Sequence, residues 1–245
     1  MKVIGVIPAR YGSTRLPGKP LADICGKPMI WWVYNRVKDI ENFEKIVVAT
    51  DHAKIVNECE KWGIPVIMTS SKHKTGANRL HEVSTLISAD YYVQINGDEP
   101  LIDKEAIKKV IPNNIPIDRP FGTNIITSIN DPALVMDPSN IKMTFDENMK
   151  CLYMSRTPIP YPYKSIDYRY YKHVGIIGYN KKMLDFYSNS VPGRQEQIEG
   201  IDTLRFLDYG YELKLVIIEK YNSLSVDTEK DLNYVRTKII NEGFK

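Results

Sequence analysis

The sequence predicts an α/β protein built around a mostly parallel β-sheet. Short apolar runs rich in β-branched residues, such as residues 3–7 and 45–50, have the length and composition of buried strands. Amphipathic stretches with apolar residues at helical spacing follow these runs, beginning with residues 28–38. Strand and helix alternate through short links in the first half of the chain, which is typical of βαβ units with parallel strands.

The elements can be assigned in order along the chain. Turns containing Pro, Asp and Asn separate the strands of the second half, and no repeat or Gly/Ser linker divides the sequence. We therefore expect one domain over residues 1–245, with a smaller lobe between about residues 118 and 195. Strands are expected at residues 3–7, 45–50, 65–69, 91–95, 125–128, 141–145, 152–155, 174–179 and 214–218, and helices at 28–38, 53–62, 79–88, 182–188 and 197–209.

The composition excludes several classes of protein. The 245 residues are 43% hydrophobic and 26% charged, a globular balance that argues against disorder. The 33 Lys and Arg against 30 Asp and Glu leave a formal charge of +3, which favours neither a nucleic-acid partner nor a membrane surface. The first apolar run ends at Pro8 and no stretch has the length of a membrane span, so we expect a cytoplasmic protein without a signal peptide.

Ligands of such sheets bind beyond the carboxyl ends of the strands. The candidate segments are residues 8–19, Asp51, residues 73–79 and residues 96–100. The first segment combines three cations with small residues whose backbone N–H groups are accessible, which suits a polyphosphate. It has neither the Walker A spacing nor the dinucleotide fingerprint, and the alternative interpretation is a solvated basic loop.

This loop resembles the N-terminal signature of the 3-deoxy-manno-octulosonate (Kdo) cytidylyltransferases, or CMP-Kdo synthetases. That family has the form Pro-Ala-Arg-x-x-Ser-Thr-Arg-Leu-Pro-Gly-Lys-Pro-Leu, and every fixed position is present from Pro8 through Leu21. The resemblance continues in order along nearly the whole chain. Its further motifs are Thr50-Asp51, His73-x-Thr75-Gly76-x-x-Arg79, Gly97-Asp98-Glu99-Pro100, residues 155–161 (Ser-Arg-Thr-Pro-Ile-Pro-Tyr), His173-Val174-Gly175 and Val226-Asp227-Thr228.

The resemblance implies both a fold and an activity. The fold is a three-layer, Rossmann-like nucleotidyltransferase with a mostly parallel sheet and a small mixed β lobe that forms a homodimer. The activity is Mg²⁺-dependent transfer of CMP from CTP to an acidic sugar, Kdo or a close relative, with release of pyrophosphate. Such an enzyme makes precursors of lipopolysaccharide or capsule. Its partners would be CTP and a small acidic acceptor, without nucleic acid or membrane.

Residue roles follow from the matching motifs. The two aspartates of the metal site, Asp98 and Asp227, have alternative interpretations as a turn residue and a helix N-cap, and His173 as a structural histidine. The resemblance assigns catalysis to Arg10, Arg15, Lys19 and Asp98, nucleotide binding to Pro8, Ala9, Arg10, Ser13, Thr14, Arg15, Lys19, Thr75, Gly76, Arg79 and Asp98, and acceptor binding to Asn96, Arg156, His173, Asp202 and Thr203.

The departures from the family pattern are concentrated in the acceptor region. Asn96 replaces a Gln, and Asp202-Thr203 replaces a Glu-Gln pair, so hydrogen-bonding reach is shortened. The resulting hypothesis is that Kdo is a poor substrate or that a related acid is used better. One alternative is a cytidylyltransferase for another acid, such as a modified octulosonate or a phosphonate. The others are a non-catalytic nucleotide-binding protein and a dehydrogenase, although the chain lacks the glycine fingerprint of the latter.

Overall fold

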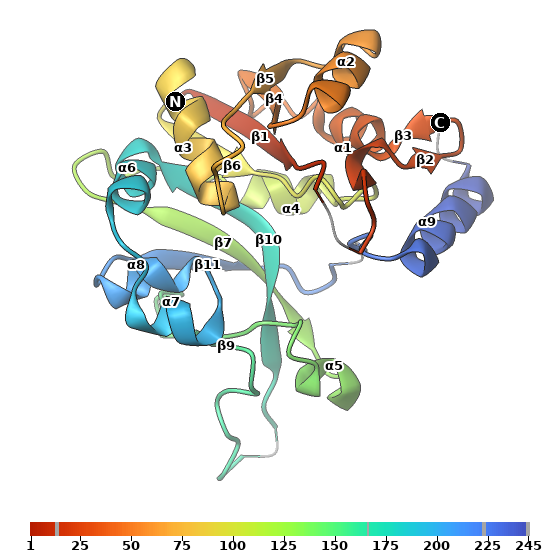
Figure 1. Ribbon diagram of the computed structural model, residues 1–245. Coiled ribbons are helices and arrows are strands. Elements are labelled where there is room, and N and C mark those ends of the chain that lie inside the picture. Colours follow the sequence, from red (N-terminus) through yellow and green to blue (C-terminus); the bar gives the residue numbers. More distant parts are fainter. Residues whose placement is uncertain (13–14, 166, 222–223, 244–245) are drawn as a thin grey trace.

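The computed structural model describes residues 1–12, 15–165, 167–221 and 224–243 and confirms the α/β fold with a mostly parallel sheet (Figure 1). The strand order is β11-β7-β10-β6-β1-β4-β5, with β8 and β9 attached beside β10. Parallel pairs join β1 to β4 and β6, β4 to β5, and β11 to β7, whereas β10 is antiparallel to both of its neighbours. The strands are β1 (Val3–Ala9), β4 (Lys45–Thr50), β5 (Val66–Met68), β6 (Tyr91–Gln94), β7 (Gly122–Ile129), β8 (Lys142–Phe145), β9 (Cys151–Ser155), β10 (Tyr170–Asn180) and β11 (Leu213–Ile217).

Both faces of the sheet are buried under helices, which gives three layers. Successive side chains of a strand point to opposite faces, so Val3 and Ile7 of β1 join one core cluster while Ile4 and Val6 join the other. The first face is covered by α1 (Met29–Val37), α2 (Ala53–Lys61) and α4 (Lys104–Lys109). The second face is covered by α3 (Gly76–Leu86), α6 (Lys181–Asn189) and α8 (Leu204–Asp208).

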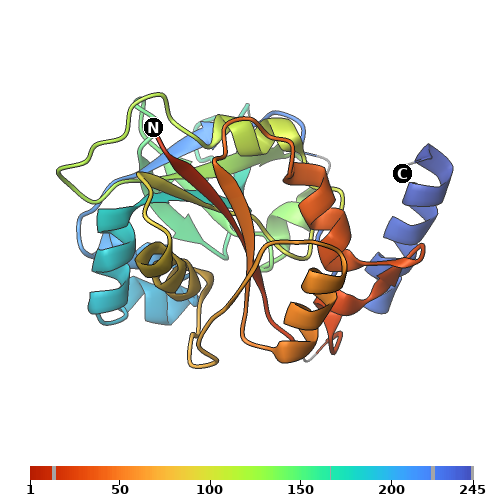
Figure 2. The same ribbon diagram turned by 90° about the horizontal axis from the view of Figure 1, so that it is seen from above.

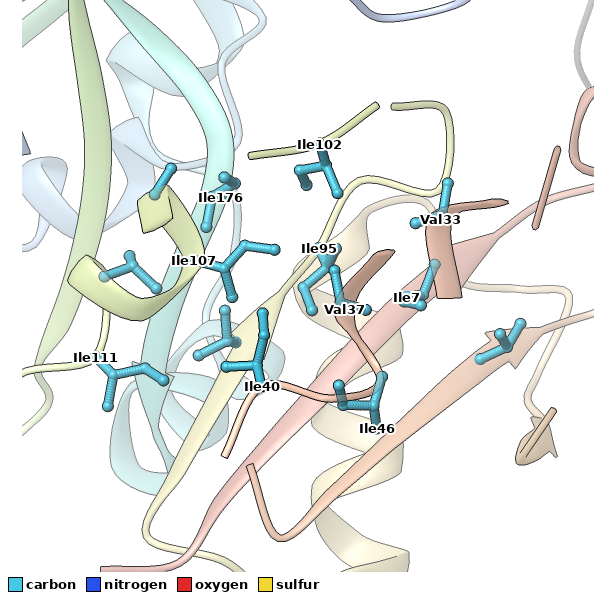
Figure 3. Close-up of a cluster of buried hydrophobic side chains, with 14 of the residues drawn as sticks. Ile7, Val33, Val37, Ile40, Ile46, Ile95, Ile102, Ile107, Ile111 and Ile176 are labelled. Atoms are coloured by element: carbon cyan, nitrogen blue, oxygen red, sulfur yellow. The ribbon is translucent and has the colours of Figure 1, made fainter. Parts of the chain in front are cut away.

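The first cluster is a continuous set of branched aliphatic side chains (Figure 3). Val33 and Val37 of α1 lie beside Ile7 of β1, and Ile107 of α4 lies near Ile176 of β10. Because these strands are apolar on both faces, the sequence shows continuous apolar runs instead of alternation.

The last helix, α9 (Glu229–Glu242), lies at one side of the molecule next to a small hairpin of β2 (Asp23–Ile24) and β3 (Lys27–Pro28) (Figure 2). A third apolar cluster joins them: Leu232 and Val235 of α9 are buried with Ile24, and Arg236 donates to the carbonyl of Asp23 at 3.0 and 2.7 Å. This packing brings the C-terminal part of the chain to the loop that follows β1.

The predicted helix over residues 197–209 is wrong as a single element. The chain forms α7 (Arg194–Glu199), ends it at Gly200 in the left-handed region with φ 61°, and starts α8 at Leu204. Glycine adopts this conformation without the steric cost of a Cβ, so it stops the helix there. Helix α3 begins three residues earlier than predicted, and the sequence reading omitted β2, β3, α4, α5 (Pro132–Met136) and the 3₁₀ turn η1 (Lys19–Leu21).

No helix within the described part of the chain combines the length and the apolar character that spanning a bilayer requires.

Candidate active site

A polar cavity of about 540 Å³ opens beyond the carboxyl ends of β1 and β6, where the sequence predicts ligand binding. We call it the first cavity. It also receives the start of α3 and the segment before α9. Its lining comprises Pro8, Ala9, Arg10, Gly12, Arg15, Lys19, Pro20, Lys74, Thr75, Gly76, Arg79, Asn96, Gly97, Asp98, Asp202 and Asp227.

The loop after β1 supplies three of the cations that line this cavity. Arg10 and Arg15 are exposed, whereas only 14% of the Lys19 side chain is accessible. The loop closes on itself through the Gly18 N–H, which donates to the carbonyl of Tyr11 at 3.1 Å. Ser13 and Thr14, which the sequence also assigns to nucleotide binding, lie outside the described residues.

Lys19, Asp98 and Asp227 form one ionic cluster. The Lys19 ammonium lies 2.7 Å from Asp98 Oδ2 and 3.0 Å from Asp227 Oδ1, and Arg15 Nη2 lies 3.0 Å from the same Asp227 oxygen. Two aspartates that are far apart in sequence therefore reach one nitrogen atom. Like charges at this separation repel each other, and the ammonium offsets that repulsion.

The backbone places Asp227 beside Asp98. The Val226 N–H donates to the Asp98 carbonyl at 2.8 Å, which ties the segment before α9 to the end of β6. The N-cap of α9 is Thr228, whose hydroxyl accepts from the Asp231 N–H, and Asp231 completes a capping box. The alternative interpretation of Asp227 as the cap is therefore wrong, and its carboxylate is available to the cavity.

The start of α3 forms another wall of the first cavity. Thr75 is its N-cap, and its hydroxyl accepts from the Asn78 N–H at 3.2 Å. Arg79 is 1% exposed and donates through Nη2 to Asp51 at 2.7 Å and through Nη1 to Thr69. The guanidinium therefore braces the ends of β4 and β5 against α3, and its edge toward the cavity is the part that a nucleotide could reach.

A second cavity of about 210 Å³ adjoins the first, because Gly76 and Asp202 line both. The acceptor candidates His173, Asp202 and Thr203 lie along it. Burial, followed by the nearby charge of Glu196, raises the pKa of Asp202. The remaining lining residues are Ala77, Gln94, Ile141, Ile177, Tyr179, Tyr187, Gly200 and Ile201.

Two predicted acceptor residues, Asn96 and Thr203, have other partners in the structure. Asn96 Nδ2 donates to Glu99 Oε1 at 3.0 Å, although the residue still lines the first cavity. Thr203 is buried, and its hydroxyl donates to Met154 Sδ at 3.2 Å. These contacts reduce what either side chain can offer an acceptor.

Arg156, which the resemblance assigns to acceptor binding, donates to backbone carbonyls. It lines neither cavity, and its guanidinium donates to the carbonyls of Pro138 at 2.9 Å, Glu199 at 2.7 Å and Gly200 at 3.1 Å. Because all three nitrogens have backbone acceptors, the arrangement does not support a carboxylate clamp. Arg156 instead holds the end of α7 against the strand β9.

Sequence reasoning assigned no role to several lining residues, among them Gly97, Gln94 and Tyr187. Gly97 has a steric reason to be glycine, since a Cβ there would lie 2.7 Å from the Pro8 carbonyl oxygen. A Cβ on Gly76 would lie 2.4 Å from Gln94 Oε1, so that glycine leaves room for the Gln94 side chain in the second cavity. The Gly-Asp pair after a strand was a usable signal for Gly97, whereas nothing local indicated Gln94 or Tyr187.

Comparison with known proteins identifies relatives over the full length. A cytidylyltransferase family model matches residues 4–220. The chain is 39% identical over 245 residues to an 8-amino-3,8-dideoxy-manno-octulosonate cytidylyltransferase of Shewanella halifaxensis (98% and 99% of the two chains). It is 38% identical over 246 residues to a 3-deoxy-manno-octulosonate cytidylyltransferase of Fusobacterium nucleatum (100% of both).

A solved structure is also similar to this chain over nearly its whole length. A CMP:2-keto-3-deoxy-manno-octonic acid synthetase complexed with CTP superposes with a TM-score of 0.90 at 35% identity, covering 99% of this chain and 100% of that one. An inositol-1-phosphate CTP transferase of T. maritima, at 14% identity and a TM-score of 0.67, shares the fold alone.

Gly97→Ala tests the close approach of two backbone segments that shapes the first cavity. The added Cβ would meet the Pro8 carbonyl oxygen, which cannot move without shifting β1, so we expect a loss of about 1–3 kcal/mol in unfolding free energy. Gly12→Ala is the matched control, since a Cβ there has no neighbour within 4 Å. Urea unfolding of both variants measures the difference. Equal stability would show that the two segments are not held together as described.

Proposed function

The chain belongs to the cytidylyltransferase family, and on that premise we propose that it transfers CMP from CTP to 3-deoxy-manno-octulosonate or a close relative and releases pyrophosphate. An acceptor oxygen attacks the α-phosphorus of CTP, and the bond from that phosphorus to the oxygen bridging to the β-phosphate breaks. The acceptor hydroxyl loses its proton to solvent or a cavity carboxylate. The product is a CMP-linked sugar acid.

The observation that carries this proposal is the meeting of cations and carboxylates in one cavity. Arg10, Arg15 and Lys19 lie on one loop, and Asp98 and Asp227 face Lys19 from two other segments. Triphosphate requires positive charge along its length, and a transferring phosphoryl group requires charge stabilisation with little covalent chemistry from the protein. The charged residues that line the first cavity, of about 540 Å³, support this assignment.

The cations have separable tasks in this scheme. Lys19 is mostly buried and held between two carboxylates, so its ammonium is oriented before a nucleotide arrives. Arg15 is 67% exposed and can follow the outer phosphates as they enter and as pyrophosphate leaves. Charge-assisted hydrogen bonds from these groups are about twice as strong as neutral ones, which favours the negatively charged leaving group.

The nucleoside end of CTP is assigned to the start of α3. Thr75, Gly76 and Arg79 line the first cavity from the start of this helix. Gly76 lines both cavities, and the Gln94 amide fills the space that its missing Cβ leaves. The three residues remain a proposal for base and ribose binding, supported by their common location.

Asp98 and Asp227 are suited to hold Mg²⁺. One oxygen of each lies within 3.0 Å of a single nitrogen, so the two carboxylates converge on a common point. No group of three or more His, Cys, Asp or Glu side chains able to hold a metal occurs among the described residues, and two carboxylates with substrate phosphate oxygens form a usual Mg²⁺ set. When bound, the ion would offset charge on the phosphate oxygens.

We further propose that the enzyme acts in the cytoplasm on precursors of lipopolysaccharide or capsule, and that it forms a homodimer through the smaller lobe of about residues 118–195. Tyr161 and Tyr163, in the connection that extends away from β9, are 82% and 84% exposed (Figure 1). Exposed aromatic side chains of this kind are enriched at protein interfaces, which supports the dimer.

The proposed function is tested by measuring CTP-dependent release of pyrophosphate with a panel of acids. We expect turnover with 3-deoxy-manno-octulosonate, with its 8-amino-3,8-dideoxy relative, or with both, and no turnover with ATP or GTP in place of CTP. The ratio of kcat/KM between the two acids decides the acceptor. Absence of CMP transfer to every sugar acid, with CTP still bound, would favour a nucleotide-binding protein without catalysis.

Asp227→Asn is expected to lower kcat by about 10²–10³-fold, because a metal ligand that loses its charge forfeits several kcal/mol of stabilisation. Binding of CTP should weaken much less, since the loop cations are unchanged. Thr228→Ala is the matched control, as it removes the true N-cap and should cost about 1 kcal/mol of stability with little effect on kcat. Similar activity of Asp227→Asn and wild type across a Mg²⁺ titration would leave Asp227 without a metal role.

Lys19→Met is expected to show opposite effects on turnover and on metal binding. Turnover with CTP should fall severely, as predicted for any loss of this cation. Binding of Mn²⁺ to the nucleotide-free protein should strengthen by at least about tenfold, because the ammonium no longer competes for the two aspartates. Calorimetric Mn²⁺ titration of both proteins measures this, and unchanged affinity would show that Lys19 and the ion do not share a position.

A further inference from the structure

A buried asparagine, Asn124, contacts the histidine that lines the second cavity. Asn124 of β7 is fully buried where β10 departs from regular pairing, between His173 and Ile177. Its Nδ2 donates to the carbonyls of Val174 at 2.8 Å and Ile176 at 3.1 Å. These bonds satisfy carbonyl groups that the irregularity removes from the sheet ladder.

The same bonds fix the orientation of the Asn124 amide. Reversing it would bring Oδ1 against backbone carbonyl oxygens, with no hydrogen between them. Asn124 Oδ1 is therefore the atom that lies 2.7 Å from His173 Nδ1, and it can only accept. The ring must carry its proton on Nδ1, which leaves Nε2 with a lone pair when the imidazole is neutral.

The surroundings of His173 keep the ring neutral. Burial lowers the pKa of His173 to about 4. The titratable groups that share the second cavity with it are Asp202 before α8, Tyr179 on β10 and Tyr187 on α6. None of the described residues bonds to Nε2, and the ring is part of the lining of the second cavity.

The second cavity therefore differs in charge from the first. It is lined by no Lys or Arg among the residues that the structure describes, and it offers the acceptors His173 Nε2 and Asp202. An acid group placed there would meet a carboxylate and a lone pair, which is unfavourable. Among the residues that line the two cavities, cations for the acid group occur only in the first cavity, which Arg10 lines together with Asp202.

We propose that Asn124 is a positioning residue that holds His173 as the Nδ1–H tautomer, so that His173 Nε2 and Asp202 accept hydrogen bonds from the hydroxyl or ammonium groups of the acceptor's tail. This inference rests on the proposed function for the identity of the acceptor. It orients that acceptor with its carboxylate toward Arg10 and its tail in the second cavity. The second cavity thus selects hydrogen-bond donors.

Imidazole ¹⁵N chemical shifts measure the tautomer directly and without substrate. The His173 signals are assigned by their loss in His173→Gln. We expect a neutral ring protonated at Nδ1 throughout pH 6–8. A ring protonated at Nε2, or one that titrates near pH 6.5, would overturn the inference whatever the protein's activity is.

Kinetics of two His173 variants test the lone pair. His173→Gln can place its amide oxygen near the position of Nε2, whereas His173→Leu offers no acceptor. We expect His173→Leu to raise KM for the acceptor by about tenfold or more and His173→Gln to recover part of this loss, with KM for CTP unchanged in both. Equal acceptor KM in wild type and His173→Leu would refute the contact.

Asn124→Asp tests the positioning role, with circular dichroism and thermal unfolding as checks that the fold is kept. A carboxylate beside Nδ1 favours the imidazolium, so acceptor KM should become pH-dependent and rise as pH falls from 8 to 6. The wild type, whose His173 has a pKa of about 4, should not show this rise. A folded Asn124→Asp protein with a wild-type pH profile would contradict the role; if it does not fold, the ¹⁵N measurement decides.

The two proposals fail in different ways. If no sugar acid is turned over by the wild type, the proposed function fails while the ¹⁵N measurement still decides the state of His173. If turnover is efficient and the His173 variants leave acceptor KM unchanged, the function stands and the inference about the second cavity fails.

Discussion

The shared ion pair of Lys19 with Asp98 and Asp227 is the interaction on which the architecture of the site depends. Its three members come from the loop after β1, the end of β6 and the segment before α9. Each carboxylate repels the other, so their approach requires a cation between them. The bond from Val226 to Asp98 and the apolar cluster under α9 hold this approach in place from the protein side. A remote C-terminal helix thereby contributes to a site built at the start of the chain.

The second cavity depends on interruptions of regular structure. β10 loses its register beside Asn124, which turns His173 toward the cavity wall, and Gly200 ends α7 so that Asp202 lies in the short link before α8. Glu196 of α7 and Arg205 of α8 form a buried ion pair with bonds of 2.6 and 2.7 Å, which joins the two helices on either side of this link. A Cβ on Gly175 would lie 1.9 Å from Asn96 Nδ2, so this glycine makes room for the side chain beside it. Rigid surroundings of this kind keep polar groups in fixed orientations.

At several positions, the contacts that a side chain makes differ from the role that its sequence motif predicts. Arg156 belongs to a family motif, yet backbone carbonyls surround its guanidinium. Thr203 belongs to a region that departs from the family, and its hydroxyl faces a buried sulfur atom. The departures at 96 and 202–203 therefore differ in consequence: Asp202 faces both cavities, whereas Asn96 and Thr203 are engaged with protein partners.

The sequence by itself determined the fold class and many residues of the first cavity, because buried strands and ordered motifs are local patterns that the chain carries without its partners. The run at 45–50 became β4 at the predicted bounds, and the loop cations line the first cavity as expected. Only the tertiary structure decided which side chains are free to act. The partner of Asp227, the engagement of Arg156 and the proton on His173 depend on segments between 18 and 208 residues away, and no local pattern encodes such contacts.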